Sequence, residues 1–143
     1  MITVTQILKA KGNETWTIEP QVTVYDALKL MAEKKIGALV VVEAGKVVGI
    51  FSERDYARKV ILKDRSSKDT PVRMIMTERV IVVTPATTVE VCMELMTGEH
   101  IRHLPVLDGD QLVGVISIGD VVKVIISEQE YLIEHLENYI VGR

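Results

Sequence analysis

The sequence has too few cysteines for disulfide bonds to stabilise the fold, so stability must come from a hydrophobic core. It contains one cysteine, Cys92, so no disulfide can form within the chain, and a reducing compartment is expected. No apolar run approaches the roughly 18 uncharged residues that a membrane span requires. The N-terminus also lacks the basic and apolar regions of a secretory signal. We therefore expect a soluble, cytoplasmic protein.

Excess charge of one sign is missing as well. The 17 Lys and Arg nearly balance the 20 Asp and Glu, giving a formal net charge of −3. This balance argues against broad binding to the phosphate backbone of nucleic acid. A chain of 143 residues with 48% hydrophobic side chains can form one compact domain or two small coupled halves, which excludes a large multidomain enzyme.

The chain does contain an internal duplication. A shift of 65 residues lays residues 17–60 over residues 82–125 without a gap and places Asp55 on Asp120. The hydrophobic pattern agrees even better than the identities. Repetition of this kind indicates two copies of one supersecondary unit.

Each copy has the pattern of a helix, two strands and a second helix. Apolar residues spaced i, i+3, i+4 and i+7 indicate an amphipathic helix after each matched proline. Two β-branched runs around turn residues predict a hairpin in each copy, over residues 38–51 and 103–117. The second helices are expected over residues 53–62 and 118–128. Because the strands are apolar on both faces, the two units are expected to pack on each other.

These elements predict a mixed α/β (α+β) fold of two pseudo-symmetric units. Residues 1–70 are expected to form the first unit with a short N-terminal helix and a polar linker, residues 71–127 the second unit, and residues 128–143 a C-terminal helix. A short helical segment is also expected over residues 72–76. Leu30 and Leu95 lie off the main apolar stripes and hint at a homodimer surface, unless the terminal helix covers them.

A Ser-x-x-Asp run stands where the hairpin ends and the second helix begins in each copy, from Ser52 to Asp55 and from Ser117 to Asp120. Free backbone N–H groups at a helix start favour an anion, and a carboxylate can accept two hydrogen bonds from a ribose diol. The same spacing also suits a capping box, in which Ser is the N-cap and Asp occupies N3 without any ligand. The spacing leaves both readings open.

The runs GKVVGIFSERD and QLVGVISIGD, each after a helix and an apolar strand, resemble tandem cystathionine-β-synthase (CBS) domains, the pair called a Bateman module. The resemblance covers nearly the whole chain and is narrowest to bacterial stand-alone signal-transduction pairs and their relatives in plant organelles. It implies a disc in which two sheets meet across a pseudo-two-fold axis, with clefts that hold adenine nucleotides. It also implies that Asp holds the ribose and that Ser lies near phosphate.

The two copies differ at positions where the resemblance implies phosphate contacts. Arg102 has a glycine as its counterpart in the first copy, and Arg54 has a glycine as its counterpart in the second. An arginine can contact phosphate oxygens through two N–H groups. If the family geometry holds, Arg54 crosses the pseudo-two-fold axis, so that both arginines join Asp120. We therefore expect a strong monophosphate site at Asp120 and a weaker or different one at Asp55, unless the arginines are solvated surface charges.

Trp16 is a further candidate, because an indole can cover the face of a base, although core or dimer packing explains it equally well. Cys92 occupies a stripe position and is expected to be a buried small side chain, and the three histidines have no metal-ligand spacing. The full set of expected ligand-binding residues is Trp16, Ile18, Gly37, Ala38, Ser52, Arg54, Asp55, Arg102, His103, Ser117, Ile118, Gly119 and Asp120.

The resemblance implies a regulatory module that binds AMP, or a related ligand such as ADP, ATP or NAD(H), and modulates a partner according to energy or redox state. The resemblance to plant relatives implies a thioredoxin-like protein as one candidate partner. A homodimer is also expected. A ligand-free assembly module is the alternative. An enzyme is disfavoured, because the sequence has no Gly-rich GxGxxG turn, activated cysteine or recognisable catalytic carboxylate pair, and no catalytic cofactor or metal is expected.

Overall fold

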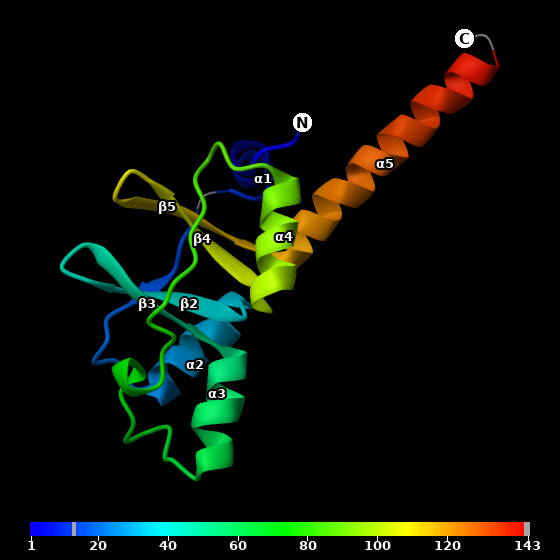
Figure 1. Ribbon diagram of the computed structural model, residues 1–143. Helices are drawn as coiled ribbons and strands as arrows, with labels where there is room; N and C mark the ends of the chain where they lie inside the picture. The colour runs from blue at the N-terminus through cyan, green and yellow to red at the C-terminus, as the bar shows by residue number, and fades with distance from the viewer. Residues whose placement is uncertain (13, 142–143) are drawn as a thin grey trace.

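The computed structural model describes residues 1–12 and 14–141 and contains the two expected units (Figure 1). The first unit consists of β1 (Thr17–Ile18), α2 (Val24–Lys34), β2 (Ala38–Glu43), β3 (Lys46–Ser52) and α3 (Glu53–Lys59). The second consists of α4 (Val89–Glu99), β4 (His103–Asp108), β5 (Gln111–Ser117) and α5 (Ile118–Ile140). A short helix, α1 (Val4–Lys11), precedes both, and 3-10 turns cover Ile61–Lys63 and Val72–Met74. The predicted mixed fold of two pseudo-symmetric units is confirmed.

The two sheets repeat the same pairing. In the first unit β2 pairs antiparallel with β3 and parallel with β1, where Ile18 lies opposite Val41. In the second unit β4 pairs antiparallel with β5, and a parallel bridge joins Val83 to Val106 at the matching place. In Figure 1 both hairpins extend to the same side of the molecule, that of the first unit below that of the second.

The first helix of each unit is delimited by the same local signals. The side chain of Thr23 accepts a hydrogen bond from Asp26 N, and the side chain of Thr88 accepts one from Val91 N. Each helix ends on a left-handed residue, Lys35 in one unit and the corresponding His100 in the other. Capping of the free N–H groups by Thr thus fixes where both helices start.

Each core buries the segment that precedes the other unit in the chain. These two segments, α1 and residues 72–79, are called the lead segments below. Val72 and Ile75, which precede the second unit in the chain, are buried in the core of the first. Val4 and Ile7 on α1, which precede the first unit, are buried in the core of the second. The two cores therefore do not coincide with the expected units of residues 1–70 and 71–127. The core of the first unit includes residues after position 70, and the core of the second includes residues of α1.

The second helices differ in length from the expectation. The helix expected over residues 53–62 ends at Lys59 and continues as a 3-10 turn, because a turn-rich linker follows it. The helix expected to stop at residue 128 instead runs unbroken to Ile140, since no Gly or Pro interrupts residues 120–140. The boundary placed at residue 127 thus falls inside one helix, whose outer half projects away from both units (Figure 1).

Two further expectations need adjustment. The helical segment expected over residues 72–76 is only the 3-10 turn Val72–Met74. Leu30 and Leu95 are half-buried and pack against their own cores, so they do not form a separate exposed apolar surface. None of the helices described is long and apolar enough to cross a membrane.

Candidate ligand-binding cleft

Both Ser-x-x-Asp runs form capping boxes at the start of their helices. The hydroxyl of Ser52 accepts a hydrogen bond from Asp55 N at 3.2 Å, and Asp55 Oδ2 accepts one from Ser52 N at 3.0 Å. In the second unit Ser117 Oγ and Asp120 N lie 3.2 Å apart, and Asp120 Oδ2 accepts from Ser117 N at 2.8 Å. The capping reading of the sequence is therefore correct, and ligand binding requires further support from the surroundings.

The carboxylate of Asp55 is buried, with 7% of the residue exposed, and has further partners from outside its helix. Its Oδ1 accepts a hydrogen bond from Thr77 Oγ1 at 3.1 Å and forms an ion pair with Lys59 Nζ at 3.2 Å. Its Oδ2 also accepts from the hydroxyl of Ser52 at 3.2 Å. With the contact to Ser52 N, the carboxylate has four contacts, about as many as its lone pairs allow.

The carboxylate of Asp120 has a different partner. Lys11 Nζ, at the end of α1, lies 2.6 Å from Asp120 Oδ2 and donates a second hydrogen bond to Val115 O at 2.8 Å. Burial alone raises the pKa of Asp120, but the hydrogen bonds from Lys11 and from Ser117 N outweigh it, so the pKa lies below its usual value. A cation of the protein itself thus occupies the position beside this aspartate.

A cavity of about 740 Å³ lies between the two units beside Asp55. The first unit contributes Ser52 and the start of α3 to its wall, and the second contributes the turn from Glu99 to Pro105. Positive side chains surround it, namely Arg54, Arg58, Lys59, Arg79 and Arg102. They outnumber the acidic Glu53, Asp55 and Glu99 that also line it, so the cavity favours an anionic ligand.

Arg54 connects the two units across this cavity. Its Nη1 donates a hydrogen bond to the carbonyl oxygen of His100, at 2.6 Å. His100 is the left-handed residue that ends α4, so its carbonyl faces the start of α3 rather than continuing the helix. The contact holds the guanidinium of Arg54 at the junction, next to the loop that contains Arg102.

His103 lies where the cleft meets the second aspartate. It lines the cavity, and its ring is near Gly37, where an added Cβ atom would meet His103 Cε1 at 3.3 Å. Burial lowers the pKa of His103, the positive charges of Lys11 and Arg102 lower it further, and Asp120 partly opposes them. The imidazole thus lines the cavity and lies within electrostatic reach of Asp120.

The structure brings together about half of the predicted residues. Gly37, Ser52, Arg54, Asp55, Arg102 and His103 line the cavity, whereas Trp16, Ile18, Ala38, Ser117, Ile118, Gly119 and Asp120 do not. In this structure Arg54 and Arg102 line the cavity beside Asp55, and the expectation that they join Asp120 stays a prediction. Arg54 reaches across to His100, beside its own unit's Asp55, and the chain entering β4 presents Arg102 to the same space.

Three predicted residues have other surroundings. Trp16 packs against the first core and has Lys34 Nζ 4.2 Å from its ring centroid, so its ring is engaged within its own unit. Ile18 and Ala38 are buried, at 8% and 7% exposure. These observations favour the core alternative for Trp16.

Sequence reasoning missed Thr77 and Arg79, which reach the cavity from the segment leading into the second unit. Both residues lie ahead of the aligned block that begins at residue 82, so the gapless comparison of the two copies gives no signal for them.

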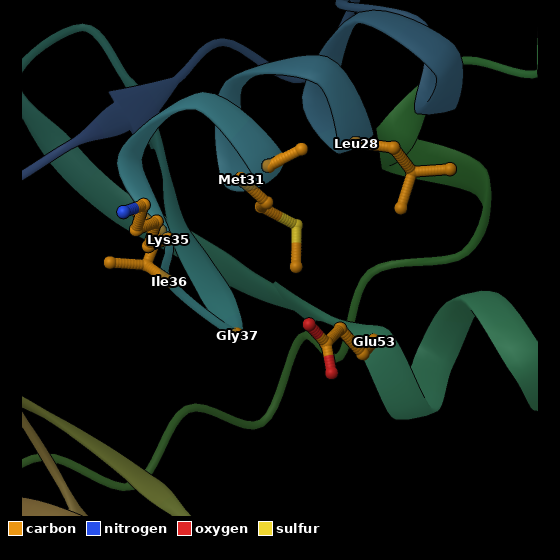
Figure 2. A pocket seen from close by; sticks show the side chains of 7 residues that line it. Leu28, Met31, Lys35, Ile36, Gly37 and Glu53 are labelled. Atoms are coloured by element: carbon orange, nitrogen blue, oxygen red, sulfur yellow. The ribbon is translucent and has the colours of Figure 1, made fainter.

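A second, smaller hollow of about 430 Å³ lies on the first unit (Figure 2), and Gly37 and Glu53 line both it and the larger cavity. Leu28, Met31 and Ile36 from α2 and the turn after it form apolar walls, and Glu53 at the start of α3 borders it. It has few polar groups that converge on one point. Its walls suit an apolar side chain better than a nucleotide.

Comparison with known proteins agrees with this architecture. The family model of the CBS domain matches residues 14–62 and 72–127, and the chain belongs to this family. It is 43% identical to the mitochondrial CBS domain-containing protein CBSX3 of Arabidopsis thaliana, over 98% of this chain and 72% of that protein.

Solved structures show the same fold. A CBS-domain protein from Burkholderia ambifaria superposes with a TM-score of 0.86 at 55% identity, covering 89% of this chain and 96% of that one. A CBS domain pair solved with 5′-methylthioadenosine and S-adenosyl-L-methionine superposes with a TM-score of 0.78 at 24% identity, covering 90% and 98%. CBS domain pairs generally bind adenosine ligands and act in regulation, and stand-alone CBS proteins are typically regulatory rather than catalytic.

Proposed function

We propose that this chain is a regulatory module that binds an adenine nucleotide, AMP in the first place, in the cleft beside Asp55. Binding there changes the affinity of the module for a partner protein. The adenine-containing ligands of a distant CBS pair support the ligand class. The phosphate of the ligand distinguishes this proposal from binding of an uncharged nucleoside.

The observation that carries the proposal is the concentration of positive groups in one cavity of suitable size. Small-molecule sites have volumes of roughly 300–1,000 Å³, and the cavity of about 740 Å³ lies within this range. Arg54 and Arg102 supply N–H groups for phosphate oxygens from opposite units. Ile81 and Ile101 supply apolar wall for the base.

Asp55 is the proposed partner of the ribose hydroxyls. Its four present contacts mean that an incoming diol must replace some of them, and the contacts at Oδ1 are the replaceable ones. The Lys59 side chain is 43% exposed, so water can solvate its ammonium group when the ion pair with Asp55 breaks. The contacts from Ser52 stay in place as the helix cap, which keeps the carboxylate oriented.

The position of the cleft provides the regulatory mechanism. Because its walls come from both units, a bound nucleotide favours one arrangement of the units over others, and a partner that prefers this arrangement senses the ligand. The regulated partner, thioredoxin-like or other, the homodimeric state and the cytoplasmic location belong to this proposal. Catalysis by Cys92 does not, because burial raises the pKa of its thiol and keeps it protonated.

A ligand-free assembly module is the second candidate, and one observation favours it. Both duplicated carboxylates already have internal partners, Asp55 four contacts and Asp120 a lysine. Under this alternative the positive charges are solvated, and no adenine nucleotide binds with useful affinity. Calorimetry with AMP decides between the two.

The test titrates AMP and adenosine into the wild-type protein and into Arg102→Ala. Loss of a charge-assisted hydrogen bond costs about 1.5–3 kcal/mol, so AMP should bind about 10- to 100-fold more weakly to the variant. Adenosine, which has no phosphate, should bind both proteins alike. An equal loss for AMP and adenosine contradicts the role of Arg102, and the absence of AMP binding to wild type favours the assembly module.

A further inference from the structure

The end of α4 is held from the first unit by two arginines. Arg54 Nη1 donates a hydrogen bond to His100 O at 2.6 Å, and Arg79 Nη2 lies 3.8 Å from Glu99 Oε1. Arg54 belongs to α3, whose start lies close to the end of α4 (Figure 1), and Arg79 belongs to the lead segment that packs on the first unit. All four residues line the cavity beside Asp55, so both contacts join the two units at its wall.

The ion pair between Arg79 and Glu99 is weak enough to be exchanged. The Arg79 side chain is 83% exposed and that of Glu99 is 39% exposed, and 3.8 Å is too long for a good hydrogen bond. Exposed ion pairs of this kind contribute little to stability. A phosphate monoester carries about 1.5–2 negative charges at pH 7, more than a carboxylate, and can accept two N–H groups from one guanidinium. Arg79 can therefore leave Glu99 for a phosphate in the cavity at little cost.

The other lead segment shows a second position for a cation at this place. A shift of 68 residues relates the two lead segments, both of which bury their first and fourth residues, and makes Lys11 the counterpart of Arg79. Lys11 Nζ lies 2.6 Å from Asp120 Oδ2, at the start of its unit's second helix. The counterpart of Glu99 is Lys34, whose positive charge cannot pair with Lys11. The acidic Glu99 thus explains why Arg79 lies at the end of α4 rather than deeper in the cleft.

We propose that Arg79 is a phosphate clamp, which leaves Glu99 when a nucleotide binds beside Asp55 and then binds the phosphate together with Arg54 and Arg102. Glu99 is the competitor that holds the guanidinium until the nucleotide arrives. This role of Arg79 rests on the proposed function and adds to it a residue that positions the phosphate. Because the exchange breaks a contact between the first unit and the end of α4, it also couples phosphate binding to the arrangement of the units.

Such a clamp distinguishes ligands by their charge. Adenosine has no anionic group that competes with the Glu99 carboxylate for a guanidinium, so Arg79 stays at the end of α4 when adenosine binds. AMP has the phosphate, and it gains a contact with Arg79 that adenosine lacks. Substitution of Arg79 should therefore change the affinity for AMP and leave the affinity for adenosine as it is.

Calorimetric titration of AMP and adenosine into wild type, Arg79→Gln and Glu99→Gln tests the clamp. Arg79→Gln should weaken AMP binding about five- to twentyfold. Glu99→Gln frees the guanidinium and should tighten AMP binding about two- to fivefold, a gain that damage to the fold would not produce. Arg73→Gln on the same lead segment and Glu94→Gln on α4 are the matched controls, because both side chains are exposed and neither lines the cavity. They should leave AMP binding unchanged.

Coupling between the two substitutions separates a clamp from a general effect of charge. If Glu99 acts by holding Arg79, Glu99→Gln should tighten AMP binding in the wild-type background and have much less effect in the Arg79→Gln background. Equal tightening in both backgrounds, or an AMP affinity that Arg79→Gln leaves unchanged, overturns the clamp while the proposed function stands. A wild-type protein that binds no AMP overturns the proposed function and the clamp together.

Discussion

Asp55 and Asp120 show how equal local sequence acquires different chemistry. Each caps the helix that follows its hairpin, and each receives a partner from the lead segment that packs on its unit. For Asp55 this partner is the hydroxyl of Thr77, and for Asp120 it is the ammonium of Lys11. Both aspartates also have a lysine beside them, but Lys59 lies 3.2 Å from Asp55 and belongs to the same helix, whereas Lys11 lies 2.6 Å from Asp120 and comes from the lead segment.

The contact between Lys11 and Asp120 should be visible in stability. Lys11→Met keeps most of the side-chain stem but removes the charge, and it should lower the free energy of unfolding by about 1 kcal/mol at pH 7. The folded-state pKa of Asp120 lies below its ordinary value, so this contribution is present above the unfolded pKa of about 3.9 and is lost as the pH falls through the folded pKa. Urea unfolding of both proteins between pH 3 and pH 7 measures the difference.

The control for this prediction is Lys9→Met on the same helix, where the side chain is exposed. It should change the unfolding free energy by a few tenths of a kcal/mol at most. A difference between wild type and Lys11→Met that stays constant as the pH falls toward 3 contradicts the assigned role of Asp120.

At the residue scale the sequence predicted the caps but not their partners. The spacing of Ser and Asp contains the capping box, because the box depends only on residues three apart in one helix. Thr77 and Lys11 lie 22 and 109 residues from the aspartates that they contact, and no local pattern links them. The placement of Arg54 and Arg102 beside one aspartate or the other depends on the same long-range packing.

At the scale of elements, a glycine in each hairpin allows a lead segment to pack closely. A Cβ atom on Gly114 would lie 2.6 Å from Leu8 Cδ2 on α1, and one on the corresponding Gly49 would lie 2.6 Å from Met76 Sδ. At these positions the second strand of each hairpin contacts a side chain of the lead segment, with which any residue larger than glycine would collide. These two glycines explain how each lead segment can dock on its unit.

Gly114→Ala should therefore destabilise the protein by about 1–3 kcal/mol, because the buried Leu8 must move to admit the methyl group. Gly98→Ala is the matched control, since Gly98 lies inside α4 with nothing within 4 Å of an added Cβ atom. It should stabilise the protein by up to about 1 kcal/mol through helix propensity. Chemical denaturation measures both, and equal effects of the two substitutions contradict the docking of α1 at Gly114.

Element ends were predictable only where a local signal marks them. Strands β2, β4 and β5 lie within a residue of the expected ranges, since turn residues delimit the hairpins. A C-terminal helix over residues 128–143 was predicted, but its continuity with the helix that begins at Ile118 was not, because the change of surroundings at residue 128, from core to solvent, leaves no mark on helix propensity. An apolar stripe that continues past the core was the available signal of a longer helix.

At the scale of the whole molecule, the two similar sites at Asp55 and Asp120 have different surroundings. The duplication builds an aspartate at the start of a helix twice, but the cavity with its four arginines adjoins the first of them. The site at Asp55 adjoins the cavity between the units and its arginines, while Lys11 forms an ion pair with Asp120. One chain of duplicated sequence thus offers one favourable place for an anionic nucleotide.

The most direct measurement of this claim is a calorimetric titration of AMP into wild type, Asp55→Asn and Asp120→Asn. Asparagine can still accept hydrogen bonds at the helix start, so both variants should keep their caps, which circular dichroism verifies. The account predicts that Asp55→Asn weakens the tighter binding event about tenfold or more, while Asp120→Asn leaves it nearly unchanged. Loss of the tighter event in Asp120→Asn, with wild-type affinity in Asp55→Asn, would contradict it.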